Sequence, residues 1–214
     1  MRVKDVMTRN PVYISPEASV TEAKILMTRQ KINKLPVLDA DKHVVGIVTK
    51  NDLIKASPSA ATTLDMYEIG YLLSRLTVEK VMSKNVTTVS EDEVIEEAAR
   101  IMADSDIGCL PVVKDELMIG IITETDLFRE FIELFGTRQK GVRVTLILDE
   151  KPGQLAKITK DIADLNGNIV SVLTWAASDP AHRSLTIKAT GVTEAQMKDI
   201  VKKEGAELTG IKVI

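Results

Sequence analysis

The sequence holds few of the residues that specialised classes of protein depend on. Aromatic residues make up 3% of its 214 positions, and it has one cysteine, Cys109, and two histidines, His43 and His182. A single thiol excludes a disulfide within the chain, and these residues do not have the spacing of a zinc site. We therefore expect no metal site, and the lone thiol is typical of a reducing compartment.

Long apolar runs and an excess of positive charge are also missing. No apolar segment approaches the roughly 20 residues that cross a bilayer, and the charged first residues lack a signal-peptide core. The formal net charge of -3 leaves no broad basic surface for a nucleic-acid backbone. The sequence predicts a cytoplasmic protein with no nucleic-acid or membrane partner.

An internal repeat is the most informative feature that is present. Each copy reads as strand, helix, strand, strand, helix, so the chain is expected to contain an internal two-fold and two related pockets. Three motifs recur at an offset of 75 or 74 residues: Val-x-x-Val-Met at 3–7 and 78–82, Leu-Pro-Val at 35–37 and 110–112, and Gly-h-h-Thr-x-x-Asp, with h hydrophobic, at 46–52 and 120–126.

The first long helix of each copy is predicted from the same two signals. Ser19-x-x-Glu22 and Ser90-x-x-Glu93 have the capping-box pattern, in which a hydroxyl and a carboxylate bind free N–H groups at a helix start. Apolar residues with helical spacing follow in both copies: Val20, Ala23, Leu26 and Met27, then Ile95, Ala98, Ile101 and Met102.

Beyond the repeats the pattern changes to that of a second domain. Its order β-α-β-β-α-β is that of a ferredoxin-like sandwich, so the whole chain is α+β or α/β in class. The connector between the repeats opens with a loop-like stretch, 57–63, before Leu64, Tyr67 and Tyr71 take up helical spacing. The predicted divisions are repeat one at 1–55, a partly helical connector at 56–77, repeat two at 78–134, a linker at 135–141 and the second domain at 142–214.

The Thr-x-x-Asp motif has two possible roles. Thr49 and Thr123 can be helix N-caps, with Asp52 and Asp126 placed to complement the helix dipole. The same geometry can also bind a ligand, because N–H groups and a hydroxyl suit phosphate and a carboxylate can accept hydrogen bonds from ribose. Residue types alone leave both roles open.

The paired motifs resemble a tandem of cystathionine-beta-synthase (CBS) domains over residues 1 to about 133. This resemblance implies a pseudo-symmetric module that binds an adenosine-containing regulatory ligand: AMP, ADP, ATP or S-adenosylmethionine. It assigns ribose to Asp52 and Asp126, and phosphate to Thr49 and Thr123.

The two copies differ in charge at the positions that would face the ligand. Repeat one has Pro11, Lys34 and Lys50, and the matching residues of repeat two are Val86, Cys109 and Glu124. The first pocket is therefore predicted to favour phosphate more than the second.

Residues 142–214 resemble an ACT domain, a small regulatory module, through Asp149-x-x-Pro152-Gly153 and Asn168-Ile169. This resemblance implies an amino-acid site between the Pro-Gly loop of one chain and the second strand of a neighbour. Its candidates are Asp149, Lys151, Pro152, Gly153, Asn168 and Ile169. The alternative is a tight Pro-Gly turn in a domain that only dimerises.

Two regulatory modules leave no segment of catalytic-domain size, and no nucleotide loop, nucleophile elbow or metal-binding helix pair is present. We therefore expect no enzyme but a homodimeric sensor that acts on an unidentified protein. The order of modules also resembles the acetoin-utilisation B-type proteins, which implies a regulatory part in acetoin or butanediol catabolism. The alternative is a dimerising adaptor with no ligand in either module.

Overall fold

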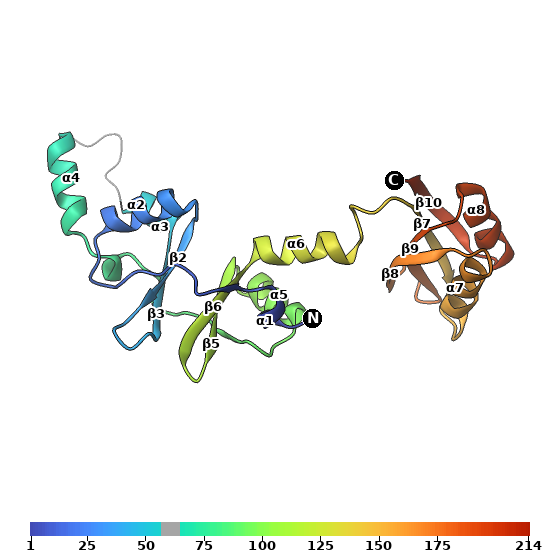
Figure 1. The fold of residues 1–214 in the computed structure, drawn as a ribbon, viewed down its shortest axis with the longest axis horizontal. Coiled ribbons are helices and arrows are strands. Elements are labelled where there is room, and N and C mark those ends of the chain that lie inside the picture. Colours follow the sequence, from blue (N-terminus) through green and yellow to red (C-terminus); the bar gives the residue numbers. More distant parts are fainter. Residues whose placement is uncertain (57–64) are drawn as a thin grey trace. The chain divides into compact units, whose positions relative to one another are not determined.

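The chain forms two compact units, Met1–Leu127 and Phe128–Ile214 (Figure 1). The computed structural model describes residues 1–56 and 65–214, without the side chain of Met66. The predictions for 57–63 and for Leu64 lie outside the described residues. No helix in the described ranges is long and apolar enough to span a bilayer.

The first unit holds both repeats, each with a β-hairpin between two helices. Its elements are α1 (Val3–Val6), β1 (Thr8–Arg9), α2 (Val20–Gln30), β2 (Lys34–Leu38), β3 (Val44–Thr49), α3 (Lys50–Lys55), α4 (Met66–Arg75), the 3-10 helix η1 (Val78–Lys80), β4 (Val89–Ser90), α5 (Ile95–Asp104), β5 (Cys109–Lys114), β6 (Leu117–Thr123) and α6 (Glu124–Leu134), which continues past the unit boundary.

The hairpins form as predicted, but the strand expected before each helix is reduced. The sheets are ordered β2-β3 and β1-β6-β5-β4. In place of the strand expected before α2, Ile14 forms a single bridge, to Val37. Pro11 and Pro16 flank this segment, and proline has no N–H to extend a ladder of hydrogen bonds.

The opening segment of each repeat packs into the core of the other. Val3 is buried with the second-repeat residues Leu110 and Val112, and its N–H donates to Glu93 O at 2.8 Å. Val78 is buried with first-repeat residues in the same way. Figure 1 shows α1, in dark blue, beside α5. The two repeats therefore share their cores by exchanging these segments.

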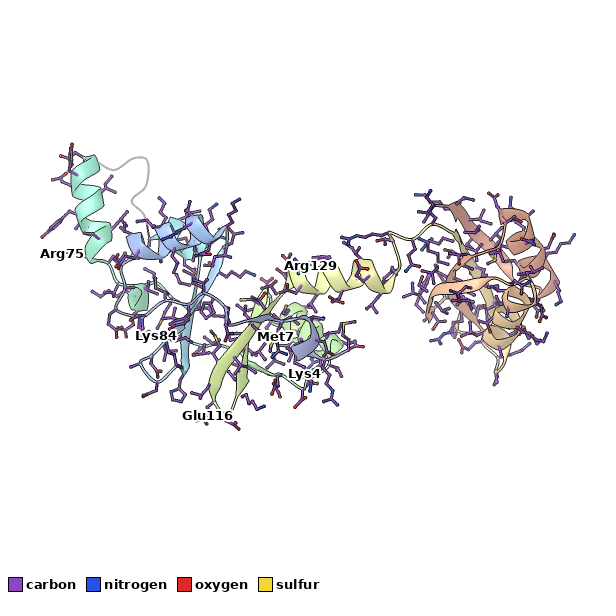
Figure 2. All side chains as sticks on the ribbon, viewed as in Figure 1. Lys4, Met7, Arg75, Lys84, Glu116 and Arg129 are labelled. Carbon is purple, nitrogen blue, oxygen red and sulfur yellow. The ribbon has the colours of Figure 1, made fainter. Side chains whose placement is uncertain are left out.

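The repeated glycine and methionine of the motifs meet at these exchanges. A Cβ on Gly46 would lie 2.3 Å from Met82 Sδ, and one on Gly120 would lie 2.6 Å from Met7 Sδ. Figure 2 labels Met7 among the elements of the second repeat. The glycine of the Gly-h-h-Thr motif thus leaves room for the methionine of the other copy.

Only one of the two predicted capping boxes forms. Ser19 N donates to Glu22 Oε2 at 2.7 Å, and Glu22 N donates to Ser19 Oγ at 3.1 Å. The Ser90 prediction was wrong, because α5 begins four residues further on, with Val94 at the N-cap and no side-chain cap. Ser90 belongs to β4, and its backbone oxygen accepts from Glu93 N in a turn.

The second unit confirms the predicted β-α-β-β-α-β order. One antiparallel sheet, ordered β10-β7-β9-β8, packs its apolar face against both helices, with Val144, Ile162, Ile187 and Met197 fully buried. The elements are β7 (Val142–Asp149), α7 (Gln154–Asp164), β8 (Asn168–Ala176), β9 (His182–Thr190), α8 (Glu194–Lys203) and β10 (Glu207–Val213).

Candidate functional site

Thr49 and Asp52 stand where β3 passes directly into α3. Thr49 N and Thr49 Oγ1 both donate to Asp52 Oδ2, at 2.8 and 2.6 Å, and Asp52 N donates back to Thr49 Oγ1 at 3.3 Å. Both bonds to the carboxylate of Asp52 use the same oxygen, Oδ2. Within the described residues, the other oxygen has no hydrogen-bond partner.

Thr123 and Asp126 repeat this geometry where β6 passes into α6. Thr123 N and Oγ1 donate to Asp126 Oδ2 at 2.9 and 2.7 Å. The second aspartate is more deeply set, since Asp126 is buried while Asp52 is half-buried. Both pairs therefore form complete helix caps without any ligand.

Several N–H groups at these helix starts are already engaged. Lys50 N donates to Asn33 O at 2.8 Å, and Glu124 N donates to Gly108 O at 3.3 Å. Asp52 N is taken by Thr49, as described above. An incoming phosphate would thus depend more on lysine side chains than on the helix N–H groups considered in the sequence analysis.

Lys34 connects the two repeats at this place. It begins β2 opposite Thr49, yet its Nζ lies 3.7 Å from Glu124 Oε2, at the first residue of α6. Gly108 was not singled out from the sequence, although a Cβ there would lie 2.1 Å from Lys34 Nζ. The absence of a side chain at residue 108 therefore leaves room for this ion pair.

Cys109 lies beside the same charges. Burial raises the pKa of its thiol, the Lys34 ammonium lowers that pKa, and the Glu124 carboxylate raises it again. The net direction is upward, so the thiol stays protonated and unreactive at neutral pH.

The other two candidates of the first pocket lie at different places. Lys50 is exposed at the start of α3. Pro11 lies on the segment that leaves β1, which pairs with β6, and reaches Ile14 beside β2. That segment crosses from the second repeat to the first.

In the second unit, the loop after β7 lines a pocket of 240 Å³ in which opposite charges are paired. Lys151 Nζ donates to Asp149 Oδ2 at 2.7 Å, which lowers the pKa of that carboxyl. Arg183 donates to Glu150 at 3.1 Å, and neither of these two residues was predicted from the sequence. Gly153 also lines the pocket, and its φ of 86° requires glycine.

Asn168 and Ile169 are not brought to this pocket. They begin β8 opposite Thr190 and Ala189, whereas Asp149 lies opposite His182 at the far end of β9. A site that used both groups would need a second chain.

Both histidines contact carboxylates, which the sequence did not indicate. His182 Nδ1 lies 2.8 Å from Asp179 Oδ2, and His43 Nδ1 lies 3.4 Å from Asp39 Oδ2. Ligand atoms of Asp39, Asp41 and His43 lie within 4.8 Å of one another. Asp39 Oδ1 accepts from the backbone N–H groups of Asp41 and His43, so this group is accounted for as the turn between β2 and β3.

Comparison with known families settles the ancestry of the repeats. Residues 3–59 and 78–133 match the model of the CBS domain. The chain belongs to the CBS-domain family. Residues 140–212 of this CBS chain match the model of the TTHA0829-like ACT domain, so it is a tandem CBS pair followed by an ACT domain. Both are regulatory modules.

Among curated relatives, the CBS pair is similar to part of L-aspartate semialdehyde sulfurtransferase from Methanocaldococcus jannaschii. The two are 32% identical over 130 residues, which are 60% of this chain and 23% of the relative. The chain therefore spans about a quarter of that enzyme's length.

Solved structures similar to this chain cover its CBS pair. A putative acetoin utilization protein (AcuB) from Vibrio cholerae is 33% identical, with a TM-score of 0.55 over 64% of this chain and 95% of that one. The CBS domain pair of protein MJ0100, in complex with 5-methylthioadenosine and S-adenosyl-L-methionine, is 30% identical, with a TM-score of 0.52 over 65% and 98%. CBSX2 in complex with AMP is 29% identical, with a TM-score of 0.51 over 64% and 98%.

Proposed function

We propose that this CBS–ACT chain is a non-enzymatic sensor whose CBS pair binds an adenosine-containing ligand: AMP, ADP, ATP or S-adenosylmethionine. Two Thr-Asp pairs of one geometry stand at equivalent strand-to-helix junctions. The similar CBS pairs of MJ0100 and CBSX2 carry adenosine compounds. Ligand binding would shift the arrangement of the pair, which a partner protein would then detect.

The observation that carries this proposal is the unused oxygen of Asp52. A cap uses one carboxylate oxygen, and here Oδ2 takes both bonds from Thr49. The remaining oxygen can accept hydrogen bonds from two ribose hydroxyls while the cap stays intact. Cap and ribose ligand are therefore compatible roles for one side chain.

Charge at the helix starts would set the preference of each pocket. Lys50 begins α3, whereas Glu124 begins α6 and is already paired with Lys34. A phosphate would be attracted by Lys50 and would compete with Glu124 for Lys34. We expect phosphate-bearing nucleotides at the first repeat, and uncharged or cationic adenosyl compounds at the second.

Calorimetric titration with AMP, ADP, ATP and S-adenosylmethionine tests the sensor. D52A should weaken binding at one pocket by about tenfold or more, because it removes hydrogen bonds to a charged acceptor. S19A is the matched control, since it breaks a capping box of the same type on α2 and should leave affinity unchanged. A melting temperature that does not move at millimolar concentrations of all four ligands would exclude the proposal.

The completeness of both caps without ligand favours one alternative, a dimerising adaptor in which Thr-x-x-Asp only starts helices. Under that alternative D52A and S19A lose similar stability, about 1 kcal/mol each, and no ligand binds. The two variants thus separate the hypotheses in one series.

For the ACT domain we propose an amino-acid site at the loop after β7. Its pocket pairs two carboxylates, Asp149 and Glu150, with two cations, Lys151 and Arg183, which matches the charges of a zwitterion. A second chain would supply Asn168 and Ile169, so the proposal includes a homodimer. Equilibrium dialysis with isotope-labelled amino acids tests this site. R183A should reduce any binding that is found.

The similarity to AcuB from Vibrio cholerae supports a regulatory part in acetoin or butanediol catabolism. Deletion of the gene should then alter growth on acetoin, and D52A should reproduce the effect. Normal growth of the deletion strain on acetoin would remove this assignment.

A further inference from the structure

The sheet of the second unit has an apolar face and a polar face. Val144, Leu146 and Ile187 point into the core shared with α7 and α8. The residues that alternate with them along each strand therefore point to the opposite, polar face. Two of these, Thr186 and Lys188 of β9, are only 1% and 2% exposed. Lysine is almost never fully buried unless it is paired, which makes Lys188 the unusual residue of this face.

Lys188 Nζ has one hydrogen-bond acceptor within the described residues. It donates to Gly136 O at 2.8 Å, and the neighbouring Ser171 Oγ donates to Phe135 O at 3.3 Å. Both carbonyls belong to the turn that follows α6, so this turn covers Lys188. An ammonium group carries three N–H donors and a full positive charge, and one carbonyl oxygen neutralises only a small part of that charge.

The residues opposite Lys188 in the sheet are also cationic. Arg143 of β7 pairs with Lys188, and Lys212 of β10 pairs with Arg143. Cross-strand partners lie on the same face, and neighbouring strands are roughly 5 Å apart, so three positive side chains stand in one line across three strands. We call Arg143, Lys188 and Lys212 the cationic row. Within the described residues, no member of this row has an ion-pair partner.

Hydroxyl groups stand next to the cationic row. Thr145 and Thr186 are cross-strand partners whose Oγ1 atoms lie 2.9 Å apart. Arg143 Nη1 donates to Thr145 Oγ1 at 3.2 Å, which holds the guanidinium beside this pair. The nearer acidic residue on this face of the four strands is Glu207, which lies opposite Ile147 and not opposite the row. This part of the face therefore offers donors and positive charge.

We propose that the cationic row and the two threonines bind a phosphate group, either free phosphate or a phosphate monoester. Like charges placed directly opposite each other destabilise a sheet, and a buried charge costs free energy unless it is paired. A dianion between Arg143 and the two lysines offsets both costs. The guanidinium fork suits phosphate oxygens, and a threonine hydroxyl can donate to the same group. The site lies at the other end of β7 from the loop proposed above for an amino acid.

Calorimetric titration of the full chain with inorganic phosphate tests the site. The ionic strength is held constant and chloride is the reference anion, so that general screening is equal throughout. R143Q/K212Q should weaken this binding by about tenfold or more, because it removes charged donors. K157Q/K202Q, at exposed lysines of α7 and α8, makes the same change in net charge and should leave the affinity unchanged.

The role of the buried ammonium is tested by thermal unfolding. Phosphate should raise the melting temperature of the wild-type chain more than chloride does at the same ionic strength, because it binds the folded state. K188M keeps a side chain of similar length without the charge, so the rise specific to phosphate should disappear. If K188M does not fold, R143Q/K212Q should show the same loss, since it changes only a half-buried and an exposed residue.

Two more titrations identify the source of the phosphate group. Glycerol phosphate is a monoester without adenosine. If it binds more tightly than inorganic phosphate, and this binding is weakened in R143Q/K212Q, the ligand is an organic phosphate, whereas the reverse order indicates free phosphate. Succinate, a dicarboxylate, should bind more weakly than both. Tighter binding of succinate through Arg143 and Lys212 would overturn the assignment to phosphate.

Three further outcomes would overturn the site itself. They are no heat with either phosphate compound, phosphate binding that R143Q/K212Q leaves intact, and equal losses in R143Q/K212Q and K157Q/K202Q. A change of mass in sedimentation for R143Q/K212Q, without any phosphate binding, would show that a second chain covers this face instead. Titration of the same proteins with AMP tests the sensor separately, because both Thr-Asp pairs lie in the first unit.

Discussion

At the scale of single residues, the motifs that recur in the sequence turn out to be contacts between the copies. Gly120 leaves room for Met7, which lies 113 positions earlier in the chain, and Gly46 leaves room for Met82, which lies 36 positions later. A Cβ at either glycine would overlap a methionine side chain unless that side chain shifted. The pattern indicated that these residues matter, and the fold shows that they matter to each other.

Alanine at these glycines should destabilise the first unit to different extents. G120A should cost about 1–3 kcal/mol, because Met7 is buried and the backbone oxygen of Thr8, at 3.0 Å, cannot move aside. G46A should cost less, because Met82 is only half-buried and can shift. Urea unfolding measures both. The control G70A, with nothing within 4 Å of its Cβ on α4, should be neutral or gain up to about 1 kcal/mol; an equal loss in all three would contradict this account.

Cys109 should react slowly with thiol reagents in the folded chain at pH 8 and rapidly in urea. Burial raises its pKa in the folded state above the value in the unfolded chain. Its contribution to stability is therefore complete below the ordinary thiol pKa of about 8.5 and is lost as pH rises toward the folded value. Unfolding free energies of wild type and C109A between pH 7 and 10 should converge, and a constant difference would rule this out.

At the scale of elements, the capping pattern predicted a helix start correctly only where its serine stands directly before the helix. The Ser19 box starts α2 as predicted, because cap and helix are adjacent in sequence. Ser90 lies 75 residues after Ser15, not after Ser19, and belongs to β4. The residue 75 positions after Ser19 is Val94, so α5 starts at Ile95 with no side-chain cap. The Ser-x-x-Glu pattern at Ser90 thus lies four residues before the true capping position, which valine occupies in the second repeat.

S19A and S90A should therefore differ, although both replace the serine of a Ser-x-x-Glu motif. S19A should lose about 1 kcal/mol of unfolding free energy, as for other N-cap substitutions. S90A should lose little, because its hydroxyl only accepts a 3.3 Å bond from Asp92 N. Chemical denaturation of the two variants side by side checks this, and equal losses would refute the assignment of the caps.

At the scale of the whole molecule, the exchange of opening segments makes the CBS pair one folding unit. Val3 and Met7 complete the core of the second repeat, and Val78, Val81 and Met82 complete that of the first. By contrast, the core of the second unit lies within residues 142–211.

Fragments should behave accordingly. A fragment of residues 1–77 should show no cooperative urea transition, because it lacks the Val78 segment and leaves its own Val3 segment without a core to enter. Fragments 1–134 and 135–214 should each unfold cooperatively in urea. Circular dichroism measures these transitions. A sharp transition in 1–77 would show that the exchange is dispensable.

The sequence by itself determined the order of elements, the two-fold repeat and the Thr-Asp caps, because periodicity, capping and turn chemistry act between residues close along the chain. The βαββαβ order of the second domain follows for the same reason. Only the tertiary structure decided which core each opening segment enters, that Lys34 reaches Glu124, and that Asn168 and Ile169 lie at the far end of the sheet from Asp149. Those outcomes depend on contacts between residues far apart in sequence, which are selected by burial and packing of the whole core rather than by any local preference.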